Sequence, residues 1–237
     1  IGRRTWRYFD TFVTPEQNYL PPDNVQESPQ FAVATRTSPT NIGVYLLSTI
    51  SARRFGWIGF QETIERLENT ITTLEKMEKY RGHLINWYHT DTLKTLGQRY
   101  VSTVDSGNLA GHLVAVSSAL REWAEAPSAH LQANLDGLGD VAGILRDALK
   151  DLPDDRKNVR PLRRRLEERI TGFTTALASV KREHEFASIR IINLAVLARD
   201  LDKLAANLHH EVKSAASEEV TKWTQTLVKT CEGHVAD

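Results

Sequence analysis

Four side chains in the middle of the chain have the types that bind polyhydroxylated ligands. Trp87 and Tyr88 are adjacent aromatic residues, and Asp105 and Asn108 follow them at short range. A sugar packs its flat C–H faces on aromatic rings and bonds its hydroxyl groups to carboxylates and amides. The four residues therefore indicate a carbohydrate-binding site. The alternative is that Trp87 and Tyr88 are core residues and that Asp105 only caps a helix.

Reaction chemistry has weaker support in the sequence. Glycoside cleavage or transfer usually takes two carboxylates that face one bond, and only Asp105 is clearly placed, so the catalytic residues are left unassigned. The chain contains no nucleophile elbow, phosphate-binding glycine loop or pair of spaced cysteines. His209, His210 and Glu211 are consecutive and cannot share one face of a helix. We therefore expect no metal site and no cofactor.

The stretch from Tyr100 to Leu113 predicts the start of a helix. Asp105 and Ser106 precede an apolar run, and their side-chain oxygens can accept the backbone N–H groups of a first turn. The remaining N–H groups of such an end could hold a hydroxyl or an anion. The helix itself, Leu109 to Trp123, is apolar enough that we expect it to be buried.

The same pattern occurs earlier in the chain. The segment that begins at Ser38 aligns with the one that begins at Asp105, so that Asn41 meets Asn108 and Leu46 meets Leu113. A repeat of this length is typical of helical hairpins.

The region around the first copy predicts a pair of helices. Residues 42–50 are apolar nearly all round, which indicates a buried helix, whereas residues 61–79 have one apolar stripe through Ile64, Leu67 and Ile71. A buried helix followed by an amphipathic one is what an inner and an outer helix of an α/α barrel would look like. Residues 80–99, which follow, form a long connection, and such connections are often functional.

A proline-rich loop precedes these helices. Pro21 and Pro22 exclude a helix there and predict a rigid loop. Asp23, Asn24 and Gln26 could present hydrogen-bonding groups to a ligand from it. An ordinary surface loop is the alternative.

The composition changes near residue 125, which predicts two parts. All the tyrosines, and every tryptophan except Trp223, lie before that point. Beyond it, apolar residues recur at spacings of three and four, as in a bundle of long helices. We therefore predict an all-α fold: a partial α/α barrel of helical hairpins in residues 1–126, followed by a helical arm or bundle in residues 127–237.

The bulk composition excludes several classes of function. Of the 237 residues, 41% are apolar and 25% charged, as in an ordinary globular protein. The 30 basic and 30 acidic side chains cancel, so nothing calls for nucleic acid as a partner. Cys231 is the only cysteine, which rules out an internal disulfide. No apolar run is long enough to cross a bilayer, and the absence of an initial methionine suggests part of a longer protein.

Three long motifs resemble the cyclic β-1,2-glucan synthases, which are large bacterial inner-membrane enzymes. They are RRTWRYFDTFVTPEQNYLPPDN (residues 3–24), RTSPTNIGVYLLSTISARRFGWIG (residues 36–59) and NWYHTDTLKTLGQRYVSTVDSGNLAGHL (residues 86–113). The resemblance covers roughly residues 3–124, and the helical part from Pro127 onward resembles the family more weakly.

The resemblance implies a place in a longer enzyme. This chain would be the N-terminal part of the middle, glycoside-hydrolase-like domain, an α/α barrel that cyclises linear β-1,2-glucan by transglycosylation. The family's catalytic glutamates would lie beyond Asp237, so the chain alone would be inactive. Arg36, Asp105 and Asn108 would then line the glucan groove.

The resemblance also implies the partners and the location. The partners would be β-1,2-glucan and the remaining domains of the same polypeptide, at the cytoplasmic face of the bacterial inner membrane. This segment would make no direct membrane contact. The alternative function is a non-catalytic helical scaffold that never touches glucan. An incomplete barrel would expose apolar surface, and we expect the isolated chain to dimerise or to need the missing half of the barrel.

Overall fold

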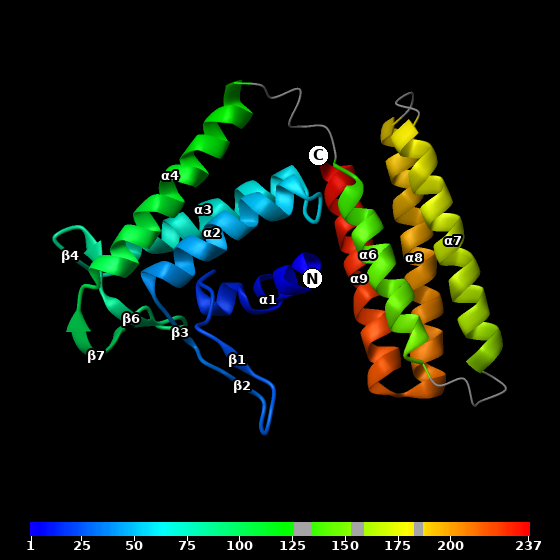
Figure 1. The fold of residues 1–237 in the computed structure, drawn as a ribbon, viewed down its shortest axis with the longest axis horizontal. Helices are drawn as coiled ribbons and strands as arrows, with labels where there is room; N and C mark the ends of the chain where they lie inside the picture. The colour runs from blue at the N-terminus through cyan, green and yellow to red at the C-terminus, as the bar shows by residue number, and fades with distance from the viewer. Residues whose placement is uncertain (126–133, 153–158, 183–186) are drawn as a thin grey trace. The chain divides into compact units, whose positions relative to one another are not determined.

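The computed structural model describes residues 1–125, 134–152, 159–182 and 187–237, and divides the chain into two compact units. The first comprises Ile1–Arg54 and Glu62–Gln132, and the second comprises Phe55–Gln61 and Ala133–Asp237. Helices dominate both units (Figure 1), which confirms the all-α prediction. The predicted boundary at residues 126–127 lies outside the described residues.

Helices and small antiparallel sheets make up the first unit. The helices are α1 (Gly2–Phe12), the short 3-10 helix η1 (Pro15–Gln17), α2 (Pro39–Arg54), α3 (Phe60–Lys76) and α4 (Thr103–Glu125). The strands are β1 (Val25–Gln26), β2 (Ala32–Val33), β3 (Arg36–Thr37), β4 (Lys79–Tyr80), β5 (His83–Leu84), β6 (Asn86–His89) and β7 (Thr95–Tyr100). Strands β1 and β2 pair, as do β4 and β5, and β6 lies between β3 and β7.

Helices α2 and α4 lie side by side and run in the same direction. Near their N-terminal ends, Asn108 of α4 donates to Thr40 of α2, and near their C-terminal ends Arg54 pairs with Glu122. Both contacts join residues 68 positions apart, close to the spacing of the sequence repeat. A Cβ atom at Gly43 would lie 2.6 Å from a ring nitrogen of His112, so the glycine permits this close approach.

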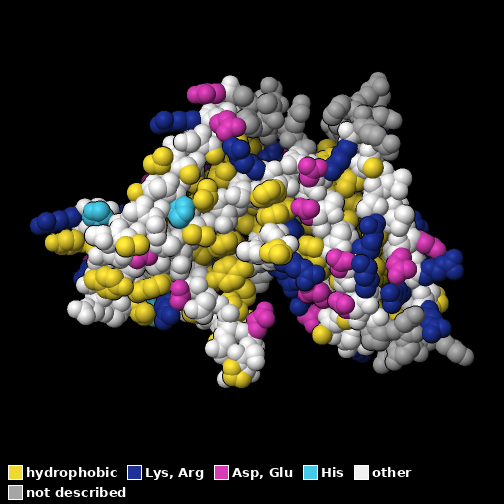
Figure 2. Space-filling view, viewed as in Figure 1, with side chains coloured by type: hydrophobic (Ala, Val, Ile, Leu, Met, Phe, Trp, Pro, Cys, Tyr) yellow, Lys and Arg dark blue, Asp and Glu magenta, His cyan; other side chains and the backbone are white. Residues whose placement is uncertain are grey.

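The two copies of the repeat differ in burial. Ile42, Tyr45 and Leu46 of α2 are buried, as predicted. Helix α4 is mostly exposed, and the prediction that it is buried was wrong for this chain: Val104 is 70% exposed and Val114 67% exposed. Within the described residues, α4 packs mainly on α2. Figure 2 shows hydrophobic side chains at the surface over these two helices.

Helix α3 is amphipathic, as predicted, but its most buried positions are shifted from the apolar stripe. Leu67 is buried together with threonines, while Ile64 and Ile71 are half-buried. The hydroxyls of Thr70 and Thr73 donate to the carbonyl oxygens of residues 19 and 18, at 3.0 and 2.8 Å. Threonine is favoured there because the face of α3 packs on irregular backbone with free carbonyl groups.

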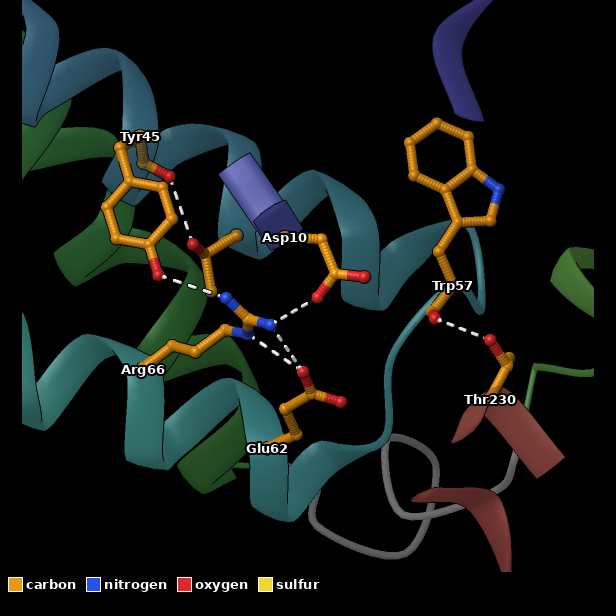
Figure 3. Close-up of polar contacts among 7 residues, drawn as sticks. Asp10, Tyr45, Trp57, Glu62, Arg66 and Thr230 are labelled. Carbon is orange, nitrogen blue, oxygen red and sulfur yellow. Dashed lines mark hydrogen bonds and ion pairs between the residues drawn. The ribbon is translucent and has the colours of Figure 1, made fainter. Parts of the chain in front are cut away.

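A charged cluster ties α1, α2 and α3 together. Arg66 of α3 contacts Asp10 of α1 at 2.6 Å, Glu62 at 2.7 Å and the hydroxyl of Tyr45 at 3.4 Å (Figure 3). Its guanidinium also lies 5.3 Å from the centre of the Trp6 ring. These partners hold the pKa of Arg66 above its usual value even though burial alone would lower it. The cluster fixes α1 on α3 and on α2, and α2 carries part of the candidate site.

The long connection after α3, predicted at residues 80–99, is a set of short strands. Strand β6 pairs with β3 through Arg36–His89 and Thr37–Tyr88. It pairs on its other side with β7 through Asn86–Tyr100, with an irregularity in the register. The connection therefore brings its aromatic residues beside β3, which leads directly into α2.

The second unit is a helical bundle, as predicted for the second half of the chain. Its helices are α6 (Asp136–Lys150), α7 (Val159–Arg182), α8 (Ala187–Val212) and α9 (Ala215–Ala236). They share one hydrophobic core that includes Leu138, Leu145, Leu166, Ile170, Phe173, Leu201, Leu208, Trp223, Leu227 and Cys231.

The bundle also holds the segment that links α2 to α3. The carbonyl oxygen of Trp57 accepts from Thr230 at 3.2 Å (Figure 3), and that of Gly56 accepts from Nε2 of His234 at 3.0 Å. The Asp237 carboxylate accepts from the backbone N–H of Phe60 at 2.7 Å, which caps the start of α3. Sequence patterns did not predict these hydrogen bonds, since the residues that form them lie far apart in the chain.

Candidate functional site

The candidate site lies where the N-terminal ends of α2 and α4 meet the β3–β6–β7 sheet. Both helices are capped by serine: Ser38 Oγ accepts from the backbone of Asn41, and Ser102 Oγ accepts from that of Asp105 at 3.1 Å. The predicted cap at Asp105 and Ser106 was therefore wrong by about one turn. The Ser102 hydroxyl is the cap, and Asp105 lies in the first turn of α4, where its side chain is directed towards α2.

The surroundings of Asp105 keep its carboxylate ionised. Partial burial alone would raise the pKa of this group. The polar groups of Ser102, Thr40 and Asn86, with the backbone of Thr40, outweigh burial and leave the pKa below its usual value. An ionised carboxylate accepts hydrogen bonds and does not donate them. Asp105 can therefore hold ligand hydroxyls but cannot act as a general acid near neutral pH.

Arg36 and Trp87 form a second part of the site. The Arg36 guanidinium lies 5.5 Å from the centre of the Trp87 ring, a cation–π arrangement. Both side chains reach solvent, since Trp87 is half-buried and the Arg36 side chain is 47% exposed. They project from neighbouring strands, because Arg36 is paired with His89 across the β3–β6 ladder. The pair offers an aromatic surface and a donor group side by side.

Asp23 links the proline-rich loop to this pair. Its carboxylate accepts from Nε and Nη2 of Arg36 at 3.2 and 2.9 Å. It also accepts from the side-chain amides of Asn24, at 3.0 Å, and Asn41, at 3.3 Å. Asn41 belongs to the first turn of α2, next to Thr40, which Asn108 contacts.

A continuous polar strip therefore joins four of the five predicted site residues. It runs from Trp87 and Arg36 through the first turn of α2 to Asp105 and Asn108, and it crosses three separate segments of the chain. The structure brings these residues together without any ligand.

Tyr88 does not belong to this strip. Successive residues of a strand face opposite sides, and Tyr88 points into the core, where it is fully buried. Its hydroxyl donates to the carbonyl of Glu78 at 2.5 Å and accepts from the backbone of Ile85 at 2.7 Å. These contacts and burial, which raises the pKa of Tyr88, give it a structural role, and the core alternative holds for this residue.

Buried polar groups lie beneath the strip. Asn86 is 1% exposed, and its amide lies close enough to Asp105 to lower the pKa of the carboxyl without making a hydrogen bond of normal geometry. The hydroxyl of Thr37, on the neighbouring strand, is also buried without a hydrogen-bond partner. Sequence reasoning missed Asn86, although its position just before Trp87 placed it in the same motif.

Metal binding and membrane spanning have no support in the described part of the chain. Within it, no group of three or more His, Cys, Asp or Glu side chains is arranged to hold a metal ion. No helix among those residues is both long and apolar enough to cross a membrane.

Comparison with known proteins gives one clear relationship. No family model matches the chain. All 237 residues align, at 70% identity, with the cyclic β-(1,2)-glucan synthase NdvB of Rhizobium meliloti strain 1021. The resemblance to the cyclic β-1,2-glucan synthases is confirmed. The chain spans only 8% of the length of NdvB and so aligns with one segment of that enzyme.

Proposed function

We propose that this chain forms part of the glucan-binding groove, and of the supporting scaffold, of the domain that cyclises linear β-1,2-glucan in a cyclic β-1,2-glucan synthase. The observation that carries the proposal is the polar strip itself. Trp87, Arg36, Asp105 and Asn108 come from three separate segments, meet on one surface and remain open to solvent or half-buried. The identity to NdvB supports the choice of glucan as the ligand.

The chemistry of the strip suits a neutral sugar. The indole of Trp87 can cover the C–H face of a glucose unit, while Asp105 accepts from hydroxyl groups and Asn108 both donates and accepts. The positive charge of Arg36 is compensated by Asp23, so the strip has no unpaired cation that would select a phosphate. Its role is binding and orientation, and the catalytic pair lies outside this set.

The barrel interpretation remains part of the proposal. Helices α2 and α4 are parallel neighbours, as successive inner helices of an α/α barrel would be, and α3 between them in sequence would be an outer helix. Further helices of the same polypeptide would then cover the exposed side of α4, where Val104 and Val114 lie. On this proposal the isolated chain lacks the catalytic glutamates and is inactive, and the complete enzyme holds this segment at the cytoplasmic face of the inner membrane.

A scaffold without glucan contact is the second candidate. It is favoured by Tyr88, whose ring is buried and whose hydroxyl is fully used within the protein. It is also favoured by the protein groups that already surround Asp105.

Calorimetric titration of linear β-1,2-glucan oligosaccharides into the chain separates the two candidates. Trp87→Ala and Asp105→Ala should each weaken binding at least tenfold, which corresponds to about 1.4 kcal/mol. Glu122→Gln is the control, because it breaks an exposed ion pair at the other end of α2 and α4. Circular dichroism checks that each variant folds.

Two outcomes would favour the scaffold. One is binding by the complete enzyme's cyclisation domain, but not by the folded chain, that Trp87→Ala and Asp105→Ala in that domain leave unchanged. The other is binding that neither Trp87→Ala nor Asp105→Ala changes. Loss of binding in these two variants, with Glu122→Gln unaffected, supports the groove.

A further inference from the structure

The Asp23 carboxylate accepts hydrogen bonds from several neighbouring side chains. It accepts two hydrogen bonds from Arg36 and one each from Asn24 and Asn41. Its side chain is only 19% exposed, whereas that of Arg36 is 47% exposed. The carboxylate is thus the fixed member of the pair and the guanidinium is the member that would otherwise move.

The backbone around Asp23 is held on both sides. Its N–H donates to the carbonyl of Ala34 at 3.1 Å, and the N–H of Ala34 donates to the carbonyl of Asn24 at 3.0 Å. The preceding Pro22 is buried, and its carbonyl accepts from the hydroxyl of Tyr8 at 2.7 Å. Burial, together with the nearby Asp23 carboxylate, raises the pKa of Tyr8 to about 12, so this donor stays protonated over the physiological range.

A fixed Asp23 determines which part of the Trp87 ring is open to a ligand. An exposed arginine on a short edge strand has many rotamers, and two hydrogen bonds from its guanidinium to one carboxylate oxygen remove most of them. Here the contact holds the guanidinium 5.5 Å from the centre of the Trp87 ring. A ring face covered by Arg36 cannot take a sugar, so a ligand is restricted to the rest of the ring.

We infer that Asp23 is a positioning residue of the glucan site: it holds Arg36 against Trp87 and thereby fixes the orientation in which the indole meets a glucose unit. The inference rests on the proposed function. Asp23 acts through Arg36 and makes no contact with the sugar in this scheme. The proline-rich loop therefore contributes to specificity by ordering its neighbour, and not by presenting its own groups to the ligand.

A double-mutant cycle tests this inference. Asp23→Asn keeps the shape of the side chain and removes its charge, and it should raise the Kd for a linear β-1,2-glucan oligosaccharide about fivefold, the scale of a lost cation–π contact. In an Arg36→Ala background the same substitution should change the Kd by less than about twofold, because the residue acts through Arg36. Glu122→Gln, which breaks another exposed arginine pair of the same unit, should leave the Kd unchanged.

A ligand-free measurement tests the positioning role of Asp23 independently of the proposed function. The indole N–H signal of Trp87, assigned by its loss in Trp87→Phe, should shift in Asp23→Asn and in Arg36→Ala, and should stay in place in Glu122→Gln. A purely structural role for Asp23 in the loop would not act on the ring through Arg36.

Each failure has its own signature. An indole signal that Asp23→Asn leaves unmoved, or effects of Asp23→Asn and Arg36→Ala that add, would overturn the positioning role while wild-type binding stands. Absence of glucan binding by the wild-type chain and by the complete enzyme's cyclisation domain would overturn the proposed function, and with it the role in glucan recognition. The indole signal would then still show whether Asp23 holds Arg36 on the ring.

Discussion

At the scale of single residues, Asp105 joins the two halves of the repeat. It lies in the first turn of α4, while the groups of Thr40 that stabilise its charge belong to the first turn of α2. A carboxylate near a helix N-terminus is also favoured by the helix dipole. The same side chain therefore contributes to stability and remains available to a ligand.

This dual role predicts a pH-dependent contribution to stability. Because the pKa of Asp105 is lower in the folded chain than its ordinary 3.8, its contribution is complete above pH 3.8 and is lost as the pH falls through the folded-state value. Asp105→Asn should lower the free energy of unfolding by about 1 kcal/mol at pH 7. Urea unfolding of both proteins at pH 7 and at low pH measures this. A difference that persists unchanged once the carboxyl is protonated would contradict the account.

Cys231 offers a residue-level test of the bundle. Its thiol is buried in the bundle core, and burial, aided by Glu232, raises its pKa to about 12 although Arg199 opposes the shift. The thiolate is the reactive form, so the folded chain should react with a disulfide reagent at pH 8 far more slowly than the chain in denaturant. The absorbance of the thiolate that the reagent releases follows the reaction. Equal rates in the two conditions would show that the bundle core is open.

At the scale of elements, α2 and α4 show that one sequence pattern can have two environments. The apolar repeat predicted both helices and their relation to each other. It could not show that α4 would be more exposed than α2 in the described part of the chain, since burial depends on what packs against a helix and not on its own composition.

Leu46 and Leu113, which are aligned in the repeat, provide a matched comparison. Leu46 is fully buried and Leu113 is 37% exposed. Leu46→Ala should cost about 3 kcal/mol of unfolding free energy, whereas Leu113→Ala should cost less than about 1 kcal/mol. Denaturant titration of the two variants checks the difference. Equal losses of unfolding free energy in the two variants would mean that α4 is covered in solution. Self-association of the chain, which we predict, is one way to cover it.

The segment held by the bundle predicts an unusually sensitive glycine. Gly56 has a φ of +72°, and a Cβ atom there would lie 1.9 Å from the carbonyl oxygen of Asn134. Gly56→Ala should therefore destabilise the second unit by about 2 kcal/mol or more.

Gly143 serves as the control for that substitution. It lies within α6, and a Cβ atom there would meet nothing within 4 Å. Gly143→Ala should raise stability by up to about 1 kcal/mol through helix propensity. Thermal unfolding of both variants measures these two changes in stability. A Gly56→Ala protein as stable as the wild type would show that the segment is not held as described.

At the scale of the whole molecule, the sequence predicted the fold class better than it predicted contacts between distant residues. Helical periodicity and the repeat gave the all-α fold and the bundle, because these depend on local spacing. The motif density around Trp87 and Asp105 gave four of the residues that the structure brings together. Tyr88 could not be separated from Trp87 by sequence, since only the pairing of β6 shows which of two adjacent side chains faces inward.

Contacts between distant segments were not predictable from one sequence. Three examples depend on the tertiary fold. They are the ion pair between Asp23 and Arg36, the hydrogen bonds from the C-terminal end of the chain to residues 55–61, and the approach of Asn86 to Asp105. A polar residue in a loop or on a short strand looks the same whether it faces solvent or a partner. Such residues make up much of the candidate site. Most of its residues could therefore be predicted from the sequence, but the hydrogen bonds between them could not.

The most direct test of the central claim is a residue-resolved map of glucan binding. Backbone and indole N–H signals of the chain would be followed by NMR as linear β-1,2-glucan oligosaccharide is added. The account predicts shifts at β6, at the first turns of α2 and α4 and at the Trp87 indole, with the bundle helices α6–α9 unchanged. Shifts centred on the bundle would contradict it. So would the absence of shifts, up to millimolar oligosaccharide (roughly the weakest affinity of interest), in both this chain and the complete enzyme's cyclisation domain.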